Sequence, residues 1–157
     1  MPSVDWKPKF SVGVERFDDD HRHLFYLLNQ LHMSMDGRES NESNSALNLI
    51  LKELFWYAQT HFRAEEVLMK RYRYPELDAH RAQHDRFTEQ VVQFAARFQS
   101  GRDEIIVEVS DTMQEWLAQH ILQSDAAYSR FFQSIGFANV GGLQQLNADC
   151  SAASTCG

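Results

Sequence analysis

Histidines recur along this sequence at spacings that suit metal ligation. His80 and His84 are four residues apart, and so are His61 and Glu65. Side chains four positions apart are neighbours on one face of an α-helix, so each pair can reach a single centre. Neutral imidazole nitrogens are good ligands for iron, zinc or copper, and a carboxylate can bridge two metal ions. Each pair therefore predicts two ligands of a metal site.

Three further polar residues complete this candidate set, namely His21, His120 and Asp125. Five histidines are too many for one zinc ion, which takes four ligands, and fit two metal ions well. Asp125 follows His120 by five residues, about 140° around a regular helix. A bridging role for Asp125 therefore requires a long reach or a locally wide turn, and by spacing alone it fits the set least well.

Four amphipathic helices would have to position these side chains. Apolar residues recur three and four apart over about 19–37, 44–72, 76–99 and 103–134, which is typical of helices in an antiparallel bundle. Gly37, Tyr74-Pro75, Ser100-Gly101 and Gly136 mark the expected helix ends. With short connections, the pattern predicts an all-α, antiparallel up-down-up-down four-helix bundle.

The candidate ligands interrupt the apolar stripes of these helices. Burying an unpaired charge costs on the order of several kcal/mol, so polar residues in four facing stripes indicate a common partner. His21 and His80 lie near the starts of the first and third helices. His61 and His120 lie about 17 residues, roughly 26 Å, into the second and fourth helices, which run the other way. The set is therefore predicted to lie in one layer near one end of the bundle.

Three parts are expected along the chain. Residues 1–18 are predicted to form an N-terminal arm packed on the bundle through Trp6, Phe10 and Phe17, followed by the bundle at 19–136 and a flexible C-terminal tail at 137–157. Asp18-Asp19-Asp20 offers an N-cap and first-turn acids for the first helix.

With these stretches identified, the sequence resembles the hemerythrin family, specifically its single-domain bacterial members. The resemblance covers roughly residues 6–136. It depends on Asp18-Asp19-Asp20-His21, the stretch His61 to Glu66, Tyr74-Pro75 with His80 and His84, and the stretch Trp116 to Asp125. The combined order H…HxxxE…HxxxH…HxxxxD is specific, whereas HxxxH alone is a weak indication.

The resemblance implies a non-haem centre of two iron ions with an oxo or hydroxo bridge and dioxygen as its ligand. It assigns His80, His84 and His120 to one iron, His21 and His61 to an iron with an open position, and Glu65 and Asp125 to the bridges. Dioxygen would bind at the open position.

Four polar residues near the candidate ligands are not part of the predicted ligand set. The family commonly has Gln before its first ligand histidine, whereas this chain has Asp20. Asp20 is either a helix-start acid or the acceptor of an N–H from a ligand histidine. Glu66 is expected to face solvent. His23 lies about 200° around the helix from His21, and His32 lies roughly 16 Å along it, so neither is expected to be a ligand.

A histidine-rich set favours reversible binding over turnover, because diiron oxygenases and ferritins use four or more carboxylates. The leading hypothesis is a dioxygen carrier, store or sensor that is not an enzyme. The alternatives are an enzyme that reduces peroxide or nitric oxide, and a redox or oxygen signalling module that acts through a partner. A reductase is a further candidate partner, and metal sequestration fits the bridged ligand set poorly. The residues expected to keep the pocket dry are Phe25, Phe62, Trp116, Leu117 and Ala118.

The composition and net charge limit the partners and the location that we expect for this protein. The chain has 157 residues and a formal net charge of -7, which argues against nucleic acid or an anionic membrane as a partner. No apolar run approaches the roughly 20 residues of a membrane span, and the first ten residues lack a secretory apolar segment. The expected location is the cytoplasm, with Cys150 and Cys156 as free thiols in the tail and the oligomeric state open.

Overall fold

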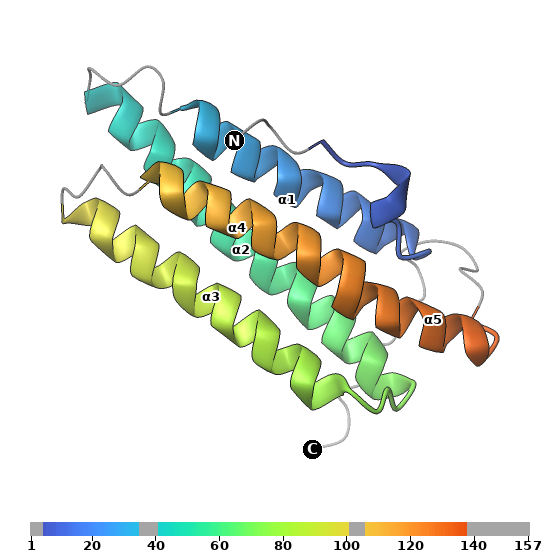
Figure 1. The fold of residues 1–157 in the computed structure, drawn as a ribbon. Helices are drawn as coiled ribbons and strands as arrows, with labels where there is room; N and C mark the ends of the chain where they lie inside the picture. Colours follow the sequence, from blue (N-terminus) through green and yellow to red (C-terminus); the bar gives the residue numbers. More distant parts are fainter. Residues whose placement is uncertain (1–4, 35–40, 101–105, 138–157) are drawn as a thin grey trace, which may run out of the picture.

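The structure is a computed structural model, and it describes residues 5–34, 41–100 and 106–137 (Figure 1). Most of these residues lie in helices. The side chains of residues 41–44 and 106–109 lie outside this description. So do the predicted first-helix end at Gly37 and, from residue 138 onward, the predicted tail with its two cysteines.

Four helices form the bundle, and the last of them continues without a break into two shorter segments. The elements are α1 (Glu15–Met33), α2 (Asn41–Arg71), α3 (Leu77–Gln99), α4 (Ile106–His120), the π-helical segment η3 (Ile121–Asp125) and α5 (Ala126–Ser134). Successive helices alternate in direction, and α2 packs against both α1 and α3 while α4 packs against α1 and α3 (Figure 1). The predicted up-down-up-down four-helix bundle is confirmed.

The first helix starts earlier than predicted. It begins at Glu15, with Val14 at the N-cap position, so the expectation that Asp18-Asp19-Asp20 would cap this helix is wrong. Phe17 belongs to the buried stripe of α1 rather than to the arm, and this apolar anchor extends the helix toward the N-terminus. Asp18 does lie in the first turn, as predicted, where a negative charge is favourable.

The arm before α1 is tied to the bundle by hydrogen bonds and apolar contacts. The Asp18 carboxylate accepts the Val12 N–H at 2.8 Å and the Ser11 hydroxyl at 2.6 Å. The Ser129 hydroxyl donates to the Val12 carbonyl at 2.7 Å, so the arm also contacts the last helix. Phe10 and Val12 are buried, whereas Trp6 is only half-buried.

The turn between α2 and α3 sets two ligand-bearing helices against each other. Arg73 adopts a φ of 55°, in the left-handed region. The Tyr74 N–H donates to the Met69 carbonyl at 2.8 Å, and the Arg73 N–H donates to the Lys70 carbonyl at 3.2 Å. Together the two hydrogen bonds form a Schellman cap. Pro75 follows directly and prevents continuation of α2, as predicted from the Tyr74-Pro75 pair.

The apolar stripes meet in one core, as the sequence pattern predicts. Buried side chains from each helix include Leu28, Leu54, Phe94 and Met113. Within the described residues, no helix combines the length and apolar character needed to cross a lipid bilayer.

Candidate metal centre

All seven predicted ligands converge in the interior of the bundle. Their exposed fractions are 5% or less: His21 0%, His61 2%, Glu65 0%, His80 3%, His84 1%, His120 5% and Asp125 0%. Each helix contributes to the cluster from its core-facing stripe, α1 with His21, α2 with His61 and Glu65, α3 with His80 and His84, and α4 with His120. Asp125 comes from η3.

Potential ligand atoms fall into two groups that share one residue. Glu65, His80, His84, His120 and Asp125 each offer an atom within 4.8 Å of all the others. The smaller group, defined in the same way, contains His21, His61 and Glu65. The cluster therefore has the layout of two adjacent sites joined through a carboxylate.

Glu65 faces both groups, with a different oxygen toward each. Its Oε1 lies 3.4 Å from His61 Nε2 and 3.9 Å from His21 Nε2. Its Oε2 lies 3.3 Å from His84 Nε2 and 3.7 Å from His80 Nε2. A carboxylate placed in this way can bind one cation through each oxygen.

Asp125 repeats this arrangement from the opposite helix. Its Oδ2 lies 3.3 Å from His21 Nε2, while its Oδ1 lies 3.0 Å from His120 Nε2 and 3.3 Å from His80 Nε2. The wide turn that the His120-to-Asp125 spacing requires is present as the π-helix η3. Because a π-helix closes hydrogen bonds between residues five apart, it brings Asp125 back to the face of His120.

Several buried polar atoms of the cluster have no hydrogen-bond partner. They are both ring nitrogens of His21, His80 Nε2, Glu65 Oε2 and both carboxylate oxygens of Asp125. Unsatisfied buried polar groups are rare and costly, and here they are lone-pair donors directed at one another. Cations between them would satisfy all of these atoms except His21 Nδ1, because it is the Nε2 of His21 that faces the carboxylates. The donor set therefore fits a pair of metal ions.

Outer partners hold three of the histidines with Nε2 facing inward. In each case the Nδ1–H donates to a side-chain oxygen behind the ring, which fixes the tautomer and the ring orientation. The three hydrogen bonds are His61 to Asp20 at 3.1 Å, His84 to Glu66 at 3.0 Å and His120 to Gln83 at 2.9 Å.

Aromatic rings pack on the histidines and exclude water from them. Phe62 stacks on His84 with a centroid distance of 3.9 Å, and Trp116 stacks on His120 at 4.5 Å. Phe17 contacts His61 edge-on at 5.7 Å. Phe62 and Trp116 thus line the cluster as predicted. Of the other predicted pocket residues, Phe25 and Leu117 are buried and Ala118 is half-buried.

The electrostatics of the cluster favour cation binding. Burial opposes ionisation of Glu65, but the surrounding histidines outweigh it and hold the pKa of Glu65 well below its ordinary value. Burial and the charge of Glu65 oppose ionisation of Asp125, yet His120 and His21 hold its pKa below the ordinary value too. Burial alone would lower the pKa of His84, but hydrogen bonds to Glu65 and Glu66 raise it to about 9.

Metal loading is therefore expected to release at least one proton per chain at about pH 7. A protonated imidazole cannot bind a metal ion, so the ion has to displace the proton of His84. The affinity should fall as the pH falls below about 9, by up to tenfold per pH unit for each proton displaced. Calorimetric titration with Zn²⁺ in buffers of different ionisation enthalpy measures the number of protons released.

The control for this measurement is His23→Ala, because His23 lies outside the cluster and pairs with Glu53 at 3.2 Å. This variant should release the same number of protons as the wild type. Zero release from the wild type at about pH 7 would contradict the expectation.

The predictions for residues outside the cluster hold for two histidines and not for one glutamate. His23 and His32 lie away from it, as predicted, and His32 pairs with Asp111 at 3.5 Å. The expectation that Glu66 faces solvent is wrong, because its side chain is only 21% exposed and accepts the His84 proton. Its position on the edge of α2 that faces α3 explains the difference, since Arg81 of α3 donates to it at 3.1 Å.

Gln83 and Tyr128 are site residues that the sequence did not reveal. The fully buried Tyr128 hydroxyl donates to Glu65 Oε1 at 2.5 Å, and burial together with the Glu65 charge raises the pKa of Tyr128 well above its ordinary value. The available signal was spacing, because Gln83 follows His80 by three residues and Tyr128 follows Asp125 by three. Residues three apart share a helix face.

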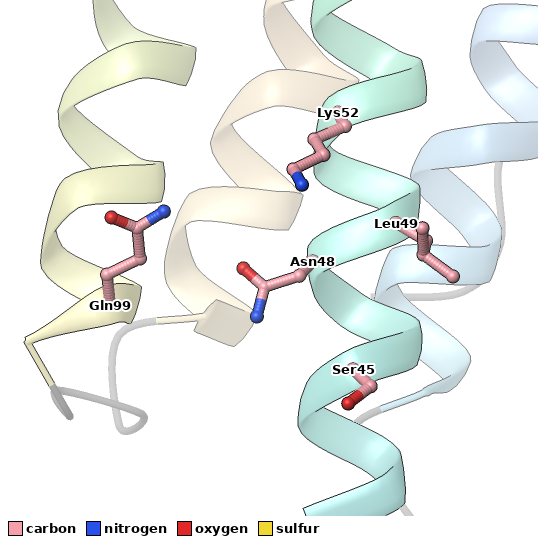
Figure 2. A pocket seen from close by; sticks show the side chains of 5 residues that line it. All are labelled: Ser45, Asn48, Leu49, Lys52 and Gln99. Atoms are coloured by element: carbon pink, nitrogen blue, oxygen red, sulfur yellow. The ribbon is translucent and has the colours of Figure 1, made fainter.

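A surface pocket lies apart from this cluster, between α2 and the end of α3 (Figure 2). It is lined by Ser45, Asn48, Leu49, Lys52 and Gln99. Lys52, its nearest residue to His61 along α2, is roughly 14 Å away by helical rise. The lining contains no carboxylate, histidine or thiol, so the ligand chemistry belongs to the buried cluster.

Comparisons with known proteins agree on one family. Residues 12–131 match the family model described as the hemerythrin HHE cation binding domain. A bacteriohemerythrin of Stenotrophomonas maltophilia is 32% identical over 129 residues, covering 82% of this chain and 81% of that protein. A bacteriohemerythrin of Clostridium acetobutylicum is 30% identical over 124 residues, covering 78% of this chain and 96% of that protein.

A solved structure is similar to this chain in fold as well as in sequence. A crystal structure of wild-type hemerythrin aligns with a TM-score of 0.72 and 27% sequence identity, covering 81% of this chain and 95% of that chain. The similarity in sequence and the similarity in fold therefore coincide over the same bundle.

Proposed function

This chain belongs to the hemerythrin family, and on that premise we propose that it binds dioxygen reversibly at a pair of iron ions inside its helical bundle. It acts as a carrier, store or sensor rather than as an enzyme. The cytoplasm is the proposed location.

The observation that carries the proposal is the placement of the two carboxylates. Glu65 and Asp125 each direct one oxygen toward the larger histidine group and the other toward His21, and Glu65 also faces His61. This arrangement supports two metal ions that share both carboxylates. In the proposed assignment, His80, His84 and His120 hold one iron, His21 and His61 hold the other, and Glu65 and Asp125 bridge them.

The bound iron ions would supply an open coordination position and the electrons on which reversible dioxygen binding depends. The smaller histidine group would leave room for that position, because it contributes two imidazoles where the other group contributes three. Phe17, Phe62 and Trp116 cover the histidines and keep water away. Tyr128 holds one oxygen of Glu65 by its hydroxyl proton, which fixes the orientation of that carboxylate.

The donor set also favours binding over turnover. Two carboxylates and five imidazoles carry little negative charge, whereas diiron oxygenases and ferritins use four or more carboxylates. Among the described residues, the cluster adds no further carboxylate to the two that face both groups. A site of this composition would favour the ferrous form, which binds dioxygen and which is restored when dioxygen leaves.

An optical spectrum of the iron-loaded protein tests the proposal. A visible band should appear when air reaches the reduced, anaerobic protein and should disappear on degassing, over several cycles. The zinc-loaded protein serves as the control and should show no band. Continuous consumption of dioxygen or peroxide in the presence of a reductant, with no reversible band, would favour the enzyme hypothesis instead.

A further inference from the structure

Asp20 places a carboxylate directly behind one of the proposed iron ligands. Its Oδ2 accepts the Nδ1 proton of His61 at 3.1 Å, and the side chains of Asp20 and His61 are 15% and 2% exposed. The same His61 ring directs its Nε2 toward Glu65 Oε1 at 3.4 Å. Asp20 therefore contacts the metal site through one imidazole, without facing the metal position itself.

The Asp20 carboxylate is shared between the His61 ring and the hydroxyl of Tyr57. Burial, the Asp20 charge and a hydrogen bond to Asp20 raise the pKa of Tyr57, so its hydroxyl is neutral and donates to the carboxylate. Glu66, the corresponding carboxylate behind His84, is instead shared with the positively charged Arg81 at 3.1 Å.

The third outer partner is uncharged. Gln83 accepts the His120 proton at 2.9 Å through its amide oxygen, which also accepts the Ser124 hydroxyl at 2.8 Å. The three outer partners thus form a graded series of a carboxylate beside a neutral hydroxyl, a carboxylate paired with a cation, and an amide. The strongest negative charge lies behind the smaller histidine group.

An imidazole that donates its N–H to a carboxylate becomes a more basic ligand through its other nitrogen. A more basic ligand stabilises the metal ion of higher charge more than the ion of lower charge. We propose that Asp20 is a positioning residue that, through His61, biases the iron pair toward its ferric state and lowers its reduction potential. The inference rests on the proposed function, because it requires His61 to bind iron, and it deepens that function by naming what sets the redox balance.

A potentiometric measurement without oxygen tests this inference. One electron passes from each ferrous ion to soluble ferricyanide, and the ferric-to-ferrous ratio is followed optically. Asp20→Asn keeps the size and an acceptor oxygen but removes the charge. It should shift the equilibrium about tenfold toward the ferrous form, which corresponds to about 59 mV for a one-electron couple.

The matched control is Asp19→Asn, one residue earlier on the same helix. Asp19 is 64% exposed and pairs with Arg22 at the surface, so the variant loses the same charge without touching a ligand. It should leave the equilibrium within about twofold of the wild type. Equal shifts in the two variants would overturn the inference, because they would reflect net charge alone.

Gln83→Glu provides the opposite change, since it adds a carboxylate behind His120. It should shift the equilibrium toward the ferric form, whereas Asp20→Glu should restore the wild-type value. A merely structural role for Asp20 would not produce shifts of opposite sign. If Asp20→Asn does not retain two irons, Gln83→Glu decides alone, and no ferric shift in that variant overturns the inference.

A readout without iron comes from nuclear magnetic resonance of the zinc-loaded protein. The His61 Nδ1 proton should resonate at low field and exchange slowly with water in the wild type, and Asp20→Asn should move it to higher field. An unmoved signal contradicts the inference. The two proposals can fail separately: a shifted equilibrium without reversible oxygen binding removes only the proposed function, and reversible oxygen binding with no shift removes only the role of Asp20.

Discussion

Glu65→Gln is expected to lower the metal content from two ions to at most one per chain and to abolish reversible dioxygen binding. Both oxygens of Glu65 face histidine nitrogens, one toward each group. Glutamine offers only one oxygen, and its amide protons would point at the other group. Loss of an outer partner already costs about 10–100-fold in metal affinity, so loss of a shared ligand should cost at least about 100-fold. Metal analysis and the optical oxygen cycle measure both effects.

The neighbouring Glu66→Gln serves as the graded control. It removes the same charge one residue later and leaves all seven proposed ligands in place, so both ions should remain with an affinity lower by at most about 100-fold. Glu53→Gln, at an exposed position, should behave as the wild type. Retention of two ions and of the reversible band in Glu65→Gln, with helical content unchanged by circular dichroism, would remove Glu65 from the proposed bridge.

The bundle could be predicted because its stripes are long and regular. Apolar residues at helical spacing specify which face of each helix is buried, and the ligands occupy that same face. The start of α1 was harder to predict from the sequence. Three aspartates in a row favour a cap, but Phe17 needs a helical position to reach the core, and its burial sets the start at Glu15. Tertiary packing outweighed a local signal that is worth about 1 kcal/mol.

Spacing indicated where the helix geometry had to change, although not how. Asp125 lies five positions after His120, and a regular helix does not place residues at that spacing on one face. The required wide turn is η3, and the sequence ILQSD over 121–125 carries no glycine or proline that would have marked it. The bridging role of Asp125 was therefore predicted from the resemblance to the hemerythrin family rather than from local propensity.

The outer partners could not be assigned from the sequence alone. Glu66, Gln83 and Asp20 each contact a histidine on a different helix from their own, so the pairing depends on the relative height and rotation of two helices. One residue of register, about 1.5 Å along the helix axis, decides whether such a side chain meets a ligand or water. For Asp20, one of the two alternatives drawn from the sequence is the observed contact with a ligand histidine.

Loading two metal ions is expected to raise Tm by roughly 15–30 °C. Without a cation, the buried lone pairs of His21, Glu65 and Asp125 face one another with few hydrogen bonds, which disfavours the folded state. Each ion at about 1,000 times its Kd adds about 4 kcal/mol, and in a chain of this size each kcal/mol is worth about 2–4 °C. Thermal unfolding of metal-free and zinc-loaded protein, followed by circular dichroism, measures the difference.

Glu65→Gln should show at most about half of the gain, because it retains at most one ion. Equal melting of the metal-free and loaded wild type would mean that the folded cluster and the unfolded chain bind the ions equally well. The convergence of seven ligands in the core would then contribute nothing to folding.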